Sequence, residues 1–157
     1  MTRIRIMIVD DHEVVRSRLK AILEPEEDLV VVGEASSGKE SVEKVAVLDP
    51  NLVLMDVRME EMSGIEACRL IKRAHPQVKV LMLTSFGDEE AVMASTMAGA
   101  SAYILKNVGR TELIQGIRGV AAGQNLLDPA VTKRVMERLA RLSAREEERD
   151  VEGLSSR

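Results

Sequence analysis

Four apolar stretches of the sequence each end in side chains that could take part in chemistry. The first runs into Asp10 and Asp11, a second into Asp56, a third into Thr84 and a fourth into Lys106. In an open α/β sheet, ligands bind outside the carboxyl ends of the parallel strands. Three carboxylates, a hydroxyl and an ammonium group are therefore expected to meet in one crevice.

Such a group of side chains fits phosphoryl transfer. Three carboxylates within a few ångströms repel one another, so one takes up a proton or the group holds a cation, for which hard oxygen ligands favour Mg²⁺. Lys106 and Thr84 would stabilise the equatorial oxygens of a transferring phosphoryl group, and Asp56 is the natural nucleophile. His12 is expected to be a surface or capping residue. Each residue alone could have a purely structural role. Because they occur together at four strand ends, a shared functional role is favoured.

Hydrophobic patterns predict the elements that place these residues. Uninterrupted apolar runs predict strands covered on both faces, and patterns with helical spacing predict a helix after each strand. Ser37 with Glu40, and Ser63 with Glu66, have the spacing of capping boxes, Asp88 can cap the fourth helix, and Gly99 can close it. Helical crossovers impose a parallel, doubly wound sheet. The strands are expected at residues 4–9, 29–33, 52–56, 78–84 and 102–105, and the helices at about 14–23, 38–48, 64–75, 88–99 and 111–122.

Composition excludes several functions. The formal net charge of -4 argues against this chain alone holding a nucleic-acid backbone, and one Phe with no Trp leaves no stacking platform for single strands. Cys68 is the only cysteine, and its spacing from Ile65 and Ile71 predicts a buried thiol on one helix face. No apolar run is long enough to cross a bilayer and no signal peptide is visible, so a cytoplasmic location without membrane association is expected.

The motifs resemble the receiver domain of two-component response regulators, specifically the NarL/FixJ class of LuxR-type regulators. The resemblance extends over residues 3 to about 123, and some short stretches of sequence are similar to those of DevR/DosR-type members. The resemblance implies a flavodoxin-like fold with strand order 2-1-3-4-5. It is carried by Asp10-Asp11-His12, the strand end at Asp56, Thr84-Ser85, Ala98-Gly99-Ala100 and Tyr103-Ile104-Leu105-Lys106.

The resemblance also implies roles for the acidic residues. Asp56 would accept a phosphoryl group from a sensor histidine kinase, and Asp10 and Asp11 would hold Mg²⁺ with Asp56 and the backbone carbonyl of Arg58. The chain would then be a phosphoacceptor switch with self-catalysed phosphotransfer and autodephosphorylation, rather than an enzyme with a separate substrate. The Arg58 side chain is expected at the pocket mouth, where it would influence the lifetime of the phosphoryl group.

A conformational switch is implied by the same resemblance. Thr84 and Lys106 would contact the phosphoryl group, Thr84 would move towards it, and Tyr103 would turn inward behind it. The phosphoryl group would act by stabilising one of two pre-existing states.

The remainder of the chain is expected to connect the receiver to an output domain. Residues 1–123 form the predicted receiver, and residues 124–157 a linker helix and tail. The final residues, 153–157, resemble the opening of a helix-turn-helix effector domain absent from this chain, so DNA binding would be a property of that domain. A homodimer is expected, through the first and fifth helices. The alternative is that phosphorylation releases a linker that occludes the effector. The linker's apolar stripe is Val131, Val135, Leu139 and Leu142.

Three other functions remain open from the sequence. A haloacid dehalogenase-type phosphohydrolase would carry its nucleophile in an Asp-x-Asp arrangement on the first strand, whereas the acids here are adjacent. A flavodoxin-like cofactor binder would need Gly, Ser or Thr in the first turn, which is acidic. A receiver-like module without phosphorylation is disfavoured because the pocket residues are retained. Three positions depart from the usual receiver pattern: Glu60 and Asn107, where proline is common, and Ala102, where glycine is common.

Overall fold

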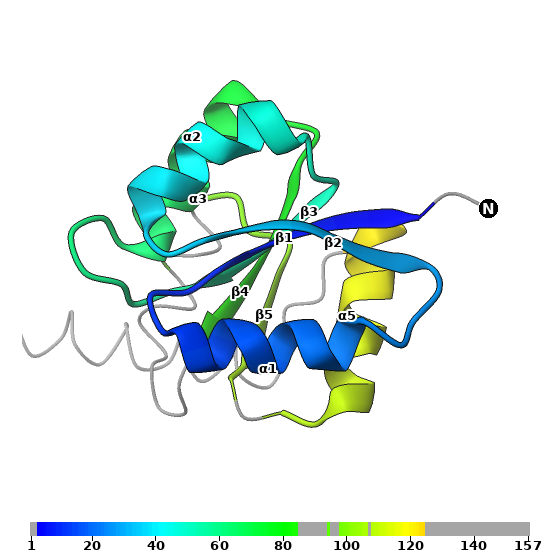
Figure 1. The fold of residues 1–157 in the computed structure, drawn as a ribbon. Helices are drawn as coiled ribbons and strands as arrows, with labels where there is room; N and C mark the ends of the chain where they lie inside the picture. The colour runs from blue at the N-terminus through cyan, green and yellow to red at the C-terminus, as the bar shows by residue number, and fades with distance from the viewer. Residues whose placement is uncertain (1–2, 85–93, 95–97, 107, 125–157) are drawn as a thin grey trace, which may run out of the picture.

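The structure, a computed structural model, describes residues 3–84, 94, 98–106 and 108–124. Five parallel strands form one sheet in the order β2-β1-β3-β4-β5 (Figure 1), which confirms the predicted strand order. The strands are β1 (Ile4–Val9), β2 (Leu29–Ala35), β3 (Leu52–Asp56), β4 (Lys79–Thr84) and β5 (Ala102–Leu105).

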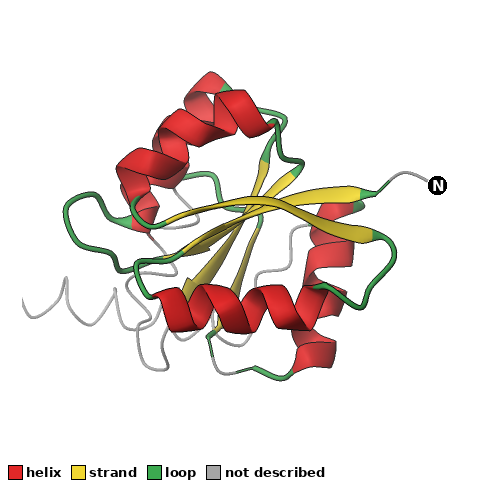
Figure 2. Cartoon of the chain, viewed as in Figure 1, coloured by secondary structure: helices red, strands yellow, loops and turns green. Residues whose placement is uncertain are grey.

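Helices cover both faces of the sheet. In Figures 1 and 2, α1 and α5 lie on one face and α2 and α3 on the other, the arrangement of a doubly wound α/β fold. Their bounds are α1 (Glu13–Leu23), α2 (Gly38–Leu48), α3 (Gly64–Ala74) and α5 (Arg110–Ala121). Most of the fourth predicted helix and the predicted linker helix lie outside the described residues. Gly99 has a φ of 98°, the left-handed conformation expected there.

The sheet separates two hydrophobic clusters because neighbouring side chains of each strand point to opposite faces. Ile6 and Leu54 pack in the cluster under α1 and α5, while Met7 and Met55 pack under α2 and α3. All residues of β3 are buried, as its unbroken apolar sequence predicted. Burying each large apolar side chain contributes about 1.5–3 kcal/mol, so the central strands anchor the acidic edge of the sheet.

Side-chain caps start the two helices that follow β2 and β3. Ser37 Oγ accepts a hydrogen bond from the Glu40 N–H at 3.1 Å, and Ser63 Oγ accepts one from the Glu66 N–H at 3.2 Å. The Glu40 carboxylate, which the capping box would place on the Ser37 N–H, accepts from Ser36 Oγ and pairs with Lys44. The serine half of the predicted cap thus fixes where α2 begins.

Strand β2 is longer than predicted. It extends to Ala35 because its pairing with β1 continues past a register shift between Ile6 and Met7. The Ala35 carbonyl then accepts a hydrogen bond from the Asp10 N–H at 3.2 Å. The extension therefore holds the backbone at the end of β1, where the acidic pair begins.

Candidate functional site

The acidic pair lies directly beyond the end of β1. Asp10 is fully buried, and its Oδ1 accepts a hydrogen bond from the His12 N–H at 2.8 Å. The Asp11 side chain is 24% exposed. The two neighbouring carboxylates thus differ in environment, because the first is buried and closes the turn into α1, whereas the second is partly exposed.

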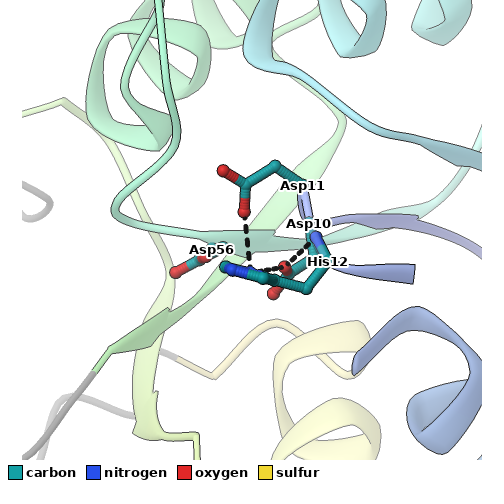
Figure 3. A group of neighbouring side chains, drawn as sticks. All are labelled: Asp10, Asp11, His12 and Asp56. Carbon is teal, nitrogen blue, oxygen red and sulfur yellow. Dashed lines mark hydrogen bonds and ion pairs between the residues drawn. The ribbon is translucent and has the colours of Figure 1, made fainter. Parts of the chain in front are cut away.

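Asp56 completes the acidic group from the end of β3. It is 3% exposed, and its Oδ1 accepts a hydrogen bond from the Arg58 N–H at 3.3 Å. Ligand atoms of Asp10, Asp11, His12 and Asp56 all lie within 4.8 Å of one another (Figure 3). The parallel sheet has therefore brought together the carboxylates that the sequence predicted.

Lys106 directly follows β5, and Thr84 is the last residue of β4. Lys106 Nζ is 3.0 Å from Asp56 Oδ2 and 3.4 Å from Asp10 Oδ2. Thr84 is 1% exposed, and its carbonyl accepts a hydrogen bond from the Lys106 N–H at 2.8 Å. All five residues that the sequence predicted to take part in chemistry thus lie at one edge of the sheet.

The pKa values of Asp56 and Lys106 are both raised above their ordinary values. Burial raises the pKa of Asp56, and the neighbouring charge of Asp10 adds to this, against the opposing hydrogen bond from Lys106. Burial alone would lower the pKa of Lys106, but the hydrogen bond and charge of Asp56, together with Asp10, raise it overall. Lys106 therefore stays charged at neutral pH. Its single positive charge cannot balance the three neighbouring carboxylates.

The site has buried oxygen atoms that can hold a cation. Among the described residues, Asp10 Oδ2, Asp11 Oδ1 and Thr84 Oγ1 are buried without a hydrogen bond of good geometry. His12 Nδ1 and Lys106 Nζ lie near two of them, at 2.9 Å from Asp11 Oδ1 and 3.4 Å from Asp10 Oδ2, as ion-pair contacts. Buried carboxylate oxygens with spare acceptor capacity suit a hard divalent ion such as Mg²⁺.

The remaining predicted residues surround this centre. Arg58 is exposed, and its N–H ties the loop after β3 to the Asp56 carboxylate. Tyr103 is 7% exposed and packs in the cluster beneath α2 and α3, so its ring is turned inward in this structure. Ser85 lies outside the described residues.

The loop after Asp56 lacks the proline that receivers often carry. Glu61 adopts a φ of 65°, in the left-handed region, although it is not glycine. Such a conformation costs an L-residue about 1–2 kcal/mol. Met59 and Met62 pack against the neighbouring core, and this packing holds the strained loop next to Asp56.

His12 is a surface residue at a helix cap position, as predicted, but its ring also contacts the acidic pair. The residue lies at the N-cap position of α1 without a side-chain capping bond, and its side chain is 66% exposed. Its ring nonetheless turns back to the acids, with Nδ1 3.1 Å from Asp10 Oδ1 and 2.9 Å from Asp11 Oδ1 (Figure 3). This contact was not predicted, and the one signal for it in the sequence is the position of His12 directly after Asp10 and Asp11.

The contact of Arg16 with the acidic turn was not predicted from the sequence either. Its Nη1 donates a hydrogen bond to the Asp10 carbonyl at 2.7 Å, and its Nε pairs with Glu34 Oε1 at 3.1 Å. Glu34 also pairs with Lys20 at 2.8 Å. Arg16 therefore links the acidic turn to β2, a contact that helix periodicity does not reveal because it joins separate elements.

Comparison with known proteins identifies the family. The model of the response regulator receiver domain matches residues 6–118, the region that contains the sheet and the acidic site. The chain belongs to the response regulator receiver domains. It is therefore a signalling switch of two-component systems, and the likeness to regulators of the LuxR and NarL types identifies it as a receiver of the NarL/FixJ class.

The relatives support this assignment over most of the chain. The response regulator protein VraR of Staphylococcus aureus is 40% identical over 136 residues, which cover 87% of this chain and 65% of that protein. The chain thus spans somewhat less than two thirds of the length of this curated relative.

Solved structures show the same fold. A LuxR-family two-component response regulator from an Aurantimonas species has a TM-score of 0.80 and 29% identity, over 88% of this chain and 99% of that chain. The receiver domain of the putative response regulator NarL from Mycobacterium tuberculosis has a TM-score of 0.74 and 26% identity, over 79% and 100% of the two chains.

The described part of the chain contains no helix long and apolar enough to cross a membrane.

Proposed function

We propose that Asp56 accepts a phosphoryl group from the phosphohistidine of a sensor histidine kinase in a Mg²⁺-dependent reaction. The observation that carries the proposal is the environment of the Asp56 carboxylate. It is 3% exposed, lies 3.0 Å from Lys106 Nζ, and shares the end of the sheet with Asp10 and Asp11. A nucleophile that contacts a lysine ammonium and lies near two further carboxylates fits phosphoryl transfer through a metal-assisted site.

The proposed step forms one bond and breaks one. A carboxylate oxygen of Asp56 forms a bond to phosphorus while the phosphorus–nitrogen bond of the donor histidine breaks. The leaving imidazole keeps the electron pair of that bond and takes up a proton. Lys106 stabilises the negative charge on the phosphoryl oxygens, and the Thr84 hydroxyl, buried without a hydrogen bond among the described residues, is available to donate to one of them.

The acidic residues fit the metal that the reaction requires. Asp10, Asp11 and Asp56 would hold Mg²⁺ with the Arg58 backbone carbonyl, and the spare acceptor capacity of Asp10 Oδ2 and Asp11 Oδ1 supports this set. When bound, the ion would neutralise charge on the incoming phosphoryl group. Hydrolysis of the resulting acyl phosphate by water would return Asp56 to its starting state.

Phosphorylation would shift the receiver between two states. Thr84 lies beside Lys106 at the strand ends, and Tyr103 of β5 pairs in register with Met82 of β4, two residues before Thr84. A phosphoryl group that draws the Thr84 hydroxyl towards it binds one arrangement better than the other. The populations of the two states then shift by that difference in affinity.

The output is proposed from the relatives. Residues 1–123 would form the receiver and residues 124–157 a linker to a helix-turn-helix domain that controls transcription through DNA. Phosphorylation would then alter homodimerisation or release a linker that occludes that domain. The likeness to a LuxR-family regulator supports this output.

Intact mass measurement after incubation with Mg²⁺ and acetyl phosphate tests the proposal. The parent chain should gain one phosphoryl group, and Asp56→Asn should gain none. Asp49→Asn is a matched control, because Asp49 is an exposed residue at the C-cap of α2 and should leave phosphorylation unchanged. Replacing Mg²⁺ with a chelator should abolish the gain. Equal labelling of the parent and Asp56→Asn, or no labelling of the folded parent with Mg²⁺, would overturn the proposal.

A further inference from the structure

The imidazole of His12 lies among the carboxylates of the acidic site. Its Nδ1 is 2.9 Å from Asp11 Oδ1 and 3.1 Å from Asp10 Oδ1, and the ligand atoms of these residues and Asp56 lie within 4.8 Å of one another (Figure 3). A nitrogen donor is thus present in a group otherwise made of oxygen donors.

These spacings match a shared coordination sphere. Two ligand atoms in adjacent octahedral positions, each about 2.1 Å from the metal, are about 3.0 Å apart. The two distances from Nδ1 to the carboxylate oxygens, 2.9 and 3.1 Å, fall on either side of that value. A cation among these atoms could therefore take Nδ1 as a ligand with little movement of the ring.

A buried oxygen beside the ring provides independent support for a cation. Asp10 is fully buried, and its Oδ2 accepts no hydrogen bond of good geometry within the described residues. The ammonium of Lys106, 3.4 Å away, partly offsets its charge but also neutralises Asp56. The site therefore retains acceptor capacity for an ion next to His12.

We infer that His12 is a metal ligand that makes the acidic site bind divalent transition ions, such as Ni²⁺ and Zn²⁺, in addition to Mg²⁺. Mg²⁺ prefers oxygen ligands and retains its waters, whereas imidazole is a preferred ligand of zinc and nickel. A neutral imidazole binds a metal through one nitrogen and keeps its hydrogen on the other. His12 therefore sets the metal selectivity of the site, an inference that rests on the proposed cation-binding function of Asp10, Asp11 and Asp56.

Calorimetric titration of the untagged chain with NiCl₂ and with MgCl₂ tests this selectivity. His12→Ala should weaken Ni²⁺ binding at least tenfold while changing Mg²⁺ binding less than threefold. His75→Ala is the matched control, because His75 is the only other histidine and lies at the C-terminal end of α3. Circular dichroism should show that both variants fold, since the His12 side chain is 66% exposed. Equal losses of Ni²⁺ and Mg²⁺ affinity, or unchanged Ni²⁺ affinity, would overturn the inference.

Imidazole nitrogen chemical shifts provide a direct readout. On addition of Zn²⁺, the nitrogen-15 signal of His12 Nδ1 should move to the position of a metal-bound nitrogen, while the signals of His75 stay in place. A shift of His75 alone, or of neither residue at saturating Zn²⁺, would contradict ligation by His12. Failure of Mg²⁺ to bind the folded parent would instead count against the proposed function, so the two failures are distinguishable.

Discussion

Replacement of Gly64 by alanine should displace the acceptor residue. Gly64 is buried at the start of α3, and a Cβ added there would lie 1.9 Å from the carbonyl oxygen and 2.9 Å from the carbonyl carbon of Asp56. Ordinary contact begins at 3.4 Å, so the two backbones must separate by about 1.5 Å. The Gly64 N–H also donates to the Val57 carbonyl at 2.9 Å, and this hydrogen bond resists the separation.

Two effects should follow from the displacement. Overpacking of this kind costs about 1–3 kcal/mol, so the free energy of unfolding should fall by that amount. Misplacement of a reacting group by about 1 Å can slow a reaction about 100-fold, so phosphorylation of Asp56 by acetyl phosphate should slow by one to two orders of magnitude. Urea denaturation followed by circular dichroism measures the first effect, and a time course of intact mass measures the second.

Gly109→Ala is the matched control for the glycine substitution. Gly109 precedes α5, and among the described residues a Cβ there would meet only Glu112 Oε2, at 3.7 Å. This variant should phosphorylate at the parent rate and lose less stability than Gly64→Ala. If Gly64→Ala lost less than about 0.5 kcal/mol and kept the parent rate, the close contact between α3 and the acceptor backbone would be refuted.

Three further predictions concern single side chains. The pKa of Asp56 is raised above 3.8 in the folded chain. The free energy of unfolding therefore falls as the pH rises through this raised pKa, because the folded chain binds the proton more tightly than the unfolded chain does. Without metal, Asp56→Asn should therefore be more stable than the parent at pH 7, with the difference narrowing towards pH 4 in urea titrations; a constant difference would contradict this. Burial raises the pKa of Cys68 to about 11, so a disulfide reagent at pH 8 should label it much faster in denaturant than in the native chain, and equal rates would show that the thiol is accessible. Arg58→Ala should shorten the lifetime of the acyl phosphate by admitting water, measured as loss of phosphorylated mass after donor removal, with the exposed Arg73→Ala as control; parent-like decay would exclude this role.

The overall fold and the main site residues followed from local patterns. Unbroken apolar runs predicted strands buried on both faces, and all of β3 is buried. The serines at the starts of α2 and α3 cap those helices as predicted. Because parallel strands end at one edge, the positions of Asp10, Asp56 and Lys106 after strand-like runs were sufficient to predict their meeting.

Contacts between separate elements could not be predicted from these patterns. The length of β2 depends on pairing with β1 past a register shift, and this pairing brings Ala35 to the Asp10 N–H. The bond from Arg16 to the Asp10 carbonyl depends on where α1 lies against the sheet. Side-chain rotamers and the placement of helices on a sheet are decided by packing, which one-dimensional periodicity does not encode.

The sequence by itself determined the parallel, doubly wound class of the sheet, its acidic edge and the chemistry available there, because residue types and their two periodicities specify which groups reach one end of a parallel sheet. The strand order was predicted only from the resemblance to receiver domains. Only the tertiary structure decided that the ring of His12 turns back to Asp10 and Asp11, and that Gly64 packs against the Asp56 carbonyl. The reason is that a side-chain direction at a helix cap, and a close approach between a helix and a loop, arise from contacts among elements whose relative positions are fixed only when the core packs.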